Sequence, residues 1–108
     1  MNPYPIPLLF LSILLAVVPV QGSAAPHLIR VSPEAVFEGD GSADAPYRTI
    51  TSALREAREL RRLGDERIAS GIRIELDDGT YRLHQPLLVR WEDSGRADSR
   101  TVIAAAEG

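Results

Sequence analysis

Acidic side chains beside glycines are the residues of this chain best suited to chemistry. Asp40 and Asp44 lie in a run rich in Gly, Asp, Ser and Pro, and their carboxylates are ligands that Ca²⁺ accepts. Asp77 and Asp78 precede Gly79, and paired carboxylates can act as general acid and general base in bond hydrolysis. Both pairs also fit ordinary turns, in which Asp bonds nearby backbone and Gly takes positive φ. We favour the turn interpretation for both pairs.

The remaining polar and aromatic residues do not assemble a recognisable active site. His84 has no Cys, His or carboxylate at the spacing of a metal ligand, and is therefore expected to be a surface or core residue. Tyr81 is expected to pack at a corner of the fold, because burying its ring is strongly favourable. Trp91, the one tryptophan, is the candidate for stacking on a sugar ring, since aromatic side chains are enriched at binding surfaces. We assign no catalytic, cofactor-binding or metal-ligating residue to this sequence.

The N-terminal segment predicts export from the cytoplasm. Residues 8–20 carry no charge, and small residues follow them directly. This stretch is shorter than the roughly 20 residues of a membrane span but suits a signal-peptide core, and Gly22 and Ala24 favour cleavage after Ala24. Residues 1–24 thus predict a signal peptide and residues 25–108 a secreted or periplasmic segment with no membrane attachment. An uncleaved anchor is the alternative, because no Lys or Arg precedes the apolar stretch.

Charge and cysteine content narrow the class of protein. The chain has 15 acidic and 12 basic residues, a net charge of −3, and this acidity argues against nucleic acid as a partner. There is no cysteine. Small secreted domains usually compensate for a thin core with disulfides, so we expect this segment to belong to a larger protein.

The clearest predicted element is a helix over residues 49–63. Thr49 can cap its first turn, and Gly64 suits the left-handed residue after its last. Arg61 projects toward the apolar side, so its charged end must reach past the contact. The opposite, charged side is expected to face water. The apolar residues recur at helical spacing: Ile50, Ala53, Leu54, Ala57 and Leu60.

Short apolar or alternating runs predict strands around the helix. These runs are residues 28–32, 72–76, 80–83, 87–89 and 101–105. Taken locally, Asp78-Gly79 would be a hairpin turn, which gives a small α+β domain with the helix on an antiparallel sheet. Residues 92–95 are expected to form a solvated turn. The last strand has nothing after it to pair with, and we therefore expect the chain to be incomplete.

The order of these pieces resembles a known family. Residues 31–33 (VSP), 39–60 (GDGSADAPYRTITSALREAREL), 72–90 (IRIELDDGTYRLHQPLLVR) and 92–108 (EDSGRADSRTVIAAAEG) are similar to the opening of right-handed parallel β-helix proteins of the pectin-lyase-like group, which includes bacterial glycoside hydrolases. The similarity covers essentially all of residues 25–108. Arg100 is one departure, since the family usually has Pro there.

This resemblance implies a fold and a function. The fold would be the first coils of a right-handed single-stranded parallel β-helix, with the helix over residues 49–63 as its N-terminal cap. The further coils would be missing. The interior would take Ile72, Ile74, Leu76, Leu87, Val89 and Val102. The intact protein would hydrolyse or cleave a polysaccharide, with its catalytic residues elsewhere and Ca²⁺ as a candidate cofactor. A non-catalytic adhesion or glycan-binding scaffold is the alternative, and a pectin-methylesterase-like enzyme is a weaker one.

Overall fold

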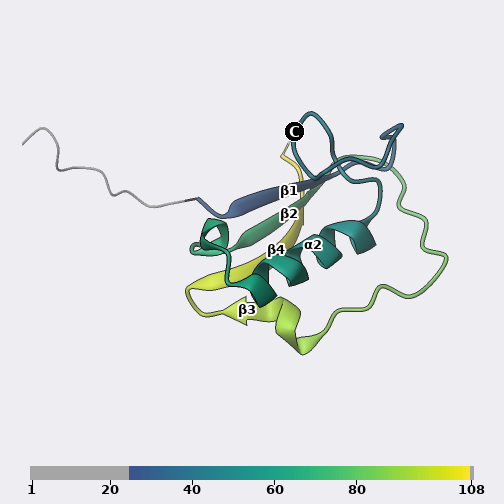
Figure 1. Ribbon diagram of the computed structural model, residues 1–108. Coiled ribbons are helices and arrows are strands. Elements are labelled where there is room, and N and C mark those ends of the chain that lie inside the picture. Colours follow the sequence, from purple (N-terminus) through teal and green to yellow (C-terminus); the bar gives the residue numbers. More distant parts are fainter. Residues whose placement is uncertain (1–24, 108) are drawn as a thin grey trace, which may run out of the picture.

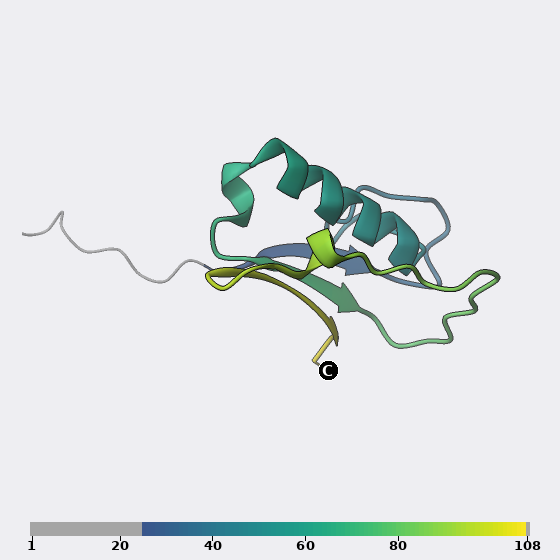
Figure 2. The same ribbon diagram turned by 90° about the horizontal axis from the view of Figure 1, so that it is seen from below.

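The computed structural model describes residues 25–107, and the predicted signal peptide lies outside them. One α-helix packs against one face of a four-stranded mixed sheet. Figures 1 and 2 show this arrangement. The strand order in the sheet is β1-β2-β4-β3. The elements are β1 (His27–Val31), α2 (Ile50–Leu63), the 3₁₀ turn η1 (Glu66–Ile68), β2 (Ile72–Leu76), the 3₁₀ turn η2 (Trp91–Ser94), β3 (Gly95–Arg96) and β4 (Ser99–Ala105).

Helix α2 begins and ends where its local signals predict. The Thr49 side chain accepts a hydrogen bond from the backbone N–H of Ser52 at 3.1 Å, which satisfies one of the free amides of the first turn. Gly64 ends the helix in the left-handed conformation, with φ at 62°, and donates its N–H to the Arg61 carbonyl. The helix predicted over residues 49–63 is confirmed.

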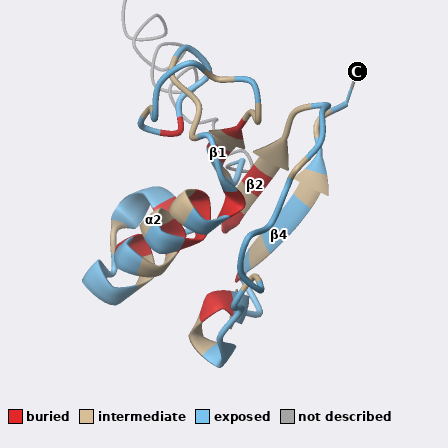
Figure 3. Cartoon of the chain, turned by 90° about the vertical axis from the view of Figure 1, so that its right-hand side faces the viewer, coloured by how far each residue is buried: buried red, intermediate tan, exposed pale blue. Residues whose placement is uncertain are grey.

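The core lies between α2 and strands β1 and β2. Figure 3 shows the buried residues gathered where the helix faces these strands, while β4 stays largely uncovered. Burying aliphatic side chains removes apolar surface from water and is the main favourable term in folding. The buried set comprises Ile50, Ala53, Leu54, Ala57 and Leu60 from the helix, Ile29, Val31, Ile72 and Ile74 from the strands, and Ile68 from η1.

The sheet is parallel over its three main strands. Ile29 pairs with Ile74, and Ile74 pairs with Ile103, so these three residues form one row on the helix side. The neighbouring row, which includes Arg73 and Val102, points to the opposite face. Parallel strands need long crossovers, and α2 with its flanking loops supplies the one between β1 and β2.

A short hairpin joins β3 to β4 and controls which side chains reach the helix side. Gly95 pairs with Arg100, and Arg96 pairs with Ser99, in antiparallel register. Residues directly opposite each other across an antiparallel pair share a face of the sheet. Arg96 therefore lies on the helix side with Ser99 and Thr101, whereas Arg100 lies on the other face.

The prediction of β-helix coils is wrong. The described residues form one mixed sheet with one helix, and no solenoid is present among them. Residues 80–83 and 87–89 were expected to be strands, but they belong to an open irregular segment that follows β2 (Figure 2). A run with strand propensity stays irregular when no neighbouring strand pairs with it, so these segments close no coil. The alternative prediction of a small α+β domain fits the structure.

Two details of the strand predictions are also corrected. Asp78-Gly79 is not a hairpin turn, because the sheet neighbours of β2 are the parallel strands β1 and β4. Ile72 and Ile74 are fully buried as expected, and Leu76 and Leu87 pack against the core. Val89 and Val102 are 59% and 44% exposed, since one lies in the irregular segment and the other on the uncovered face of the sheet.

Within residues 25–107, no helix is long and apolar enough to span a membrane.

Candidate functional site

A hollow of about 500 Å³ opens beside the C-terminal end of α2, between the helix and the segment that carries η2 and β3. We call it the α2–η2 hollow. It combines one large aromatic side chain with several arginines and carboxylates. The side chains that matter for its chemistry are Arg58, Arg61, Arg62, Trp91, Glu92 and Arg96.

Trp91 is the aromatic member of the hollow and is 89% exposed. It begins η2, so the position of its backbone depends on how that turn is held. The Asp93 carboxylate accepts a hydrogen bond from the backbone N–H of Arg90 at 2.7 Å, which closes the turn on itself. The indole of Trp91 is therefore exposed to solvent, while the hydrogen bond of Asp93 holds the backbone of its turn in place.

Asp93 joins η2 to the helix through a two-pronged ion pair with Arg58. Nε and Nη2 of Arg58 lie 2.9 and 2.7 Å from the two carboxylate oxygens of Asp93. Asp93 is only 4% exposed, so the expectation of a solvated turn at residues 92–95 is wrong for this residue. Hydrogen bonds from Arg58 lower the pKa of Asp93 below its usual value, against the opposing effect of burial. Burying a carboxylate costs free energy, and an ion pair with two hydrogen bonds from one arginine offsets that cost.

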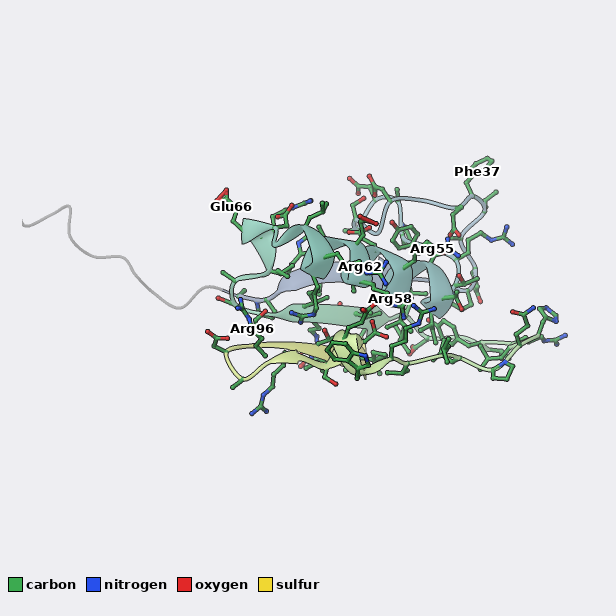
Figure 4. All side chains as sticks on the ribbon, turned by 60° about the horizontal axis from the view of Figure 1, so that its bottom comes forward. Phe37, Arg55, Arg58, Arg62, Glu66 and Arg96 are labelled. Atoms are coloured by element: carbon green, nitrogen blue, oxygen red, sulfur yellow. The ribbon has the colours of Figure 1, made fainter. Side chains whose placement is uncertain are left out.

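Glu92 extends this pair into a charged network over the helix surface. Its carboxylate lies 2.7 Å from Nη2 of Arg62 and 3.4 Å from Nε of Arg58. Figure 4 shows Arg58 and Arg62 projecting from α2 toward the η2 segment. The charged side of α2 is thus partly covered by residues 91–94, although it was expected to face water.

Arg61 reaches across to β4, as its place on the apolar side of the helix requires. Nε and Nη2 donate to the Thr101 hydroxyl at 3.0 and 2.7 Å, and Nη1 donates to the Ser99 hydroxyl at 3.3 Å. Ser99 in turn donates to the Ile68 carbonyl. No carboxylate of the described residues lies within ion-pair distance of Arg61. Its hydrogen-bond acceptors are neutral hydroxyl oxygens, and the Asp93 carboxylate acts on its charge only from a longer distance.

Gly95 leaves the space that the Arg61 guanidinium occupies. Its φ is 84°, a conformation that L side chains rarely adopt. A Cβ at this position would lie 2.5 Å from Nη2 of Arg61 and would clash with the Ser99 carbonyl oxygen. Glycine is therefore required here by both the backbone conformation and the packing.

A second, wider hollow of about 800 Å³ lies at the other end of the helix. The irregular segment after β2 forms one side, with His84 exposed in it, and Arg48, Arg55 and Glu38 form the other. Glu38 accepts hydrogen bonds from the Arg48 backbone and the Ser52 hydroxyl, and the first of these does most to lower its pKa. This hollow has no exposed Trp, and its walls belong to a segment without regular structure.

The acidic pairs singled out in the sequence behave as turn residues. Asp40 accepts a hydrogen bond from the Ser42 backbone at 3.0 Å, and bonds from Ser42 lower its pKa. Asp77 donates its backbone N–H to the Val31 carbonyl and contacts Arg30 at the edge of ion-pair distance. Neither pair lines the α2–η2 hollow. The described residues bring no three Asp, Glu, His or Cys side chains together as a metal site, so we assign no Ca²⁺ ligands to them.

Sequence reasoning named Trp91 but did not find the arginines around it. The helical spacing places Arg61 on the apolar side but does not predict its partners on β4. Arg58 and Arg62 lie on the charged side, where nothing in the local pattern distinguishes a paired arginine from a solvated one. Arg96 lies two residues before Asp98 in a polar turn and carries no local signal either. Gly95 was the available clue, because glycine after η2 allows a close approach of another group.

Comparison with known proteins identifies one solved structure among the matches, named "Glycoside hydrolase". It shares 47% sequence identity over 75% of this chain, with a TM-score of 0.71. The chain spans 14% of the length of that protein. No protein-family model matches the chain, and no curated protein matches it. Identity at this level reflects common descent as well as a similar fold, so this chain is related to a glycoside hydrolase.

Proposed function

We propose that this chain contributes a carbohydrate-contacting surface to a secreted protein, and that Trp91 is the stacking platform of that surface. The observation that carries the proposal is the 47% identity to a structure named glycoside hydrolase, taken with the exposed indole in a polar hollow. Residues 1–24 support secretion by their signal-peptide pattern.

The chemistry of the hollow suits a sugar. A pyranose ring has a face of C–H groups and a rim of hydroxyls. The indole of Trp91 offers an apolar surface to the first, and the side chains of Arg62 and Glu92 offer donors and acceptors to the second. Burying the surface of a tryptophan side chain is strongly favourable, and a ligand stacked on Trp91 would bury much of the indole surface that is now exposed. Binding sites typically combine an apolar contact with a few placed polar groups in this way.

Hydrolysis of a glycosidic bond by a longer protein that includes this sequence is the second candidate. It is favoured by the relation to a structure named glycoside hydrolase. On that view, the catalytic carboxylates would lie outside the described residues, and the α2–η2 hollow would hold a part of the polysaccharide away from the bond that is cleaved. Release of new reducing ends from a glycan panel by that longer protein would support it.

The primary proposal is tested by glycan binding. The full chain is immobilised and screened against polysaccharides of plant, algal and animal origin, with the Trp91→Ala variant beside it. We expect at least one polysaccharide to bind the wild-type chain and to bind the variant at least tenfold more weakly. Absence of binding across the panel, or equal binding by both proteins, would contradict the proposal.

A further inference from the structure

Two arginines in the α2–η2 hollow lack the carboxylate partners that the others have. Arg58 and Arg62 are paired with Asp93 and Glu92. Arg61 and Arg96 line the same hollow, and neither forms an ion pair with a described residue. The chain as a whole carries a net charge of −3, so two neighbouring arginines without an ion pair are contrary to its overall acidity.

Arg61 is partly buried between α2 and β4, and a partly buried guanidinium is normally paired with a carboxylate. Burial and the neighbouring charge of Arg96 lower its pKa, against a smaller opposing effect of Asp93. Its hydrogen bonds to Thr101 and Ser99 use three of its five N–H groups. Two N–H groups, one on each terminal nitrogen, therefore remain for another acceptor. A guanidinium donates readily to the oxygens of a carboxylate or a sulfate.

The hairpin brings the second charge to the same side. Arg96 is exposed and lies opposite Ser99, on the helix side of the sheet, and Figure 4 shows it at the hairpin that follows η2. A like charge placed near Arg61 is unfavourable in the free protein. An anionic group bound between the two would turn that repulsion into attraction, which is the arrangement expected of a ligand site.

The carboxylates of the hollow do not cancel this charge. Asp65 is bound by Arg67, with 2.9 Å between Nη2 and Oδ2. Glu92 is shared by Arg58 and Arg62. Glu66 lines the hollow from η1 as the one carboxylate there without an ion pair among the described residues. Two unpaired arginines thus face one unpaired carboxylate.

We propose that the α2–η2 hollow selects acidic saccharides, with the anionic substituent held by Arg61 and Arg96 and the sugar ring stacked on Trp91. The proposal rests on the proposed function and specifies its ligand class as a sugar bearing a carboxylate or a sulfate ester. The ring contact supplies sugar recognition, and the two guanidinium groups distinguish the acidic sugar from its neutral counterpart. Electrostatic selection of this kind weakens as salt is added.

The test uses the full chain and three probes with one backbone: dextran, carboxymethyl dextran and dextran sulfate. Dextran measures the contribution of ring contact without charge. The two charged dextrans show whether a carboxylate or a sulfate is preferred. The variants are Arg96→Gln and, as matched control, Arg100→Gln. Arg100 is an exposed arginine of the same hairpin without an ion pair among the described residues, and it lies on the opposite face of the sheet.

We expect one or both charged dextrans to bind at least about tenfold more tightly than dextran, which is the gain expected from one added charge-assisted contact. This difference in affinity should shrink as salt is added. Arg96→Gln should remove most of this preference and Arg100→Gln should leave it intact. Equal binding of charged and neutral dextrans, or equal losses in the two variants, would overturn the inference and leave sugar binding itself standing. Failure of all three dextrans to bind, while glycans of the wider panel do bind, would likewise overturn the inference. Failure of the dextrans and of the panel would remove the proposed function as well.

A second variant tests the role of Arg61 in the folded protein. Arg61→Lys keeps the charge but loses the fork that two oxygens require. It should weaken binding of the charged dextran while binding of neutral dextran stays unchanged. Equal weakening toward both probes would assign Arg61 a structural role only, and would contradict the proposal.

Discussion

Arg58 and Asp93 lie 35 positions apart in the chain, yet Nε and Nη2 of the arginine are 2.9 and 2.7 Å from the two oxygens of the carboxylate. This pair fixes the η2 turn, and with it Trp91, against the outer surface of α2. The sheet contributes little to this attachment, because β3 is only two residues long. The geometry of the proposed binding surface therefore depends mainly on this buried ion pair, with the pairs of Glu92 to Arg58 and Arg62 beside it.

Removing one partner of that pair should destabilise the fold. In Asp93→Ala, the Arg58 charge loses its main counter-charge in a largely water-excluded place, and we expect a loss of about 3 kcal/mol in the free energy of unfolding. Glu92→Gln is the control. The exposed pair of Glu92 with Arg62 should contribute less than about 1 kcal/mol. Urea unfolding of the three proteins measures both values, and similar small losses in the two variants would contradict this assignment.

The same carboxylate should make stability depend on acid. Arg58 lowers the pKa of Asp93 in the folded protein below the value of about 3.9 that an unfolded chain has. The contribution of Asp93 is therefore complete above about pH 5, and it is lost as the pH falls through the unfolded value to the lower, folded pKa. We expect the unfolding free energy of the wild-type chain to fall more steeply below pH 4 than that of Asp93→Asn. Parallel curves for the two proteins would show that Asp93 is not the group responsible.

Two glycines with positive φ allow a test of the Arg61 packing. At Gly64, a Cβ would meet open space, so Gly64→Ala should cost only about 1 kcal/mol of backbone strain. At Gly95, the same change adds a clash with the Ser99 carbonyl and displaces Arg61, and should cost more than about 2 kcal/mol. Thermal unfolding of the two variants compares them directly. An equal shift in melting temperature would mean that glycine is required at position 95 only for its positive φ, and not for packing against Arg61.

The helix cap should show a smaller, local effect. Thr49→Ala removes the acceptor for the Ser52 amide and should lower the unfolding free energy by about 1 kcal/mol, whereas Thr49→Ser keeps the hydroxyl and should change it little. Thr51→Ala, an exposed change two residues into the helix, serves as a control because Ala favours helix. If Thr49→Ser were as costly as Thr49→Ala, the lost hydrogen bond would not be the cause.

The elements that the sequence predicts well are those whose signals are local. The spacing of Ile50, Leu54 and Leu60, together with Thr49 and Gly64, determines α2 without reference to the rest of the chain. The alternation over residues 72–76 likewise predicts β2 with the bounds that the structure has. In both cases the pattern repeats with the period of the element itself.

The features that sequence reasoning missed all depend on partners distant in the chain. Residues 80–83 have the composition of a strand, but no neighbouring strand pairs with them, so they remain irregular. Val102 is apolar, but the register with Arg73 turns it to the uncovered face. Residues 92–95 have the composition of a solvated turn, and Asp93 is buried only because Arg58 forms an ion pair with it. A family resemblance built on motif order could not supply these pairings, which is why the β-helix prediction failed.

Trp91 is the one tryptophan of the chain, so its fluorescence reports on the proposed site without any label. The decisive measurement is a titration of the full chain with oligosaccharides from the polysaccharides that it binds. We predict a saturable blue shift of the emission, since a stacked ring would remove water from an indole that is 89% exposed. A spectrum that stays unchanged while a sugar binds would contradict the central claim that Trp91 is the contact surface.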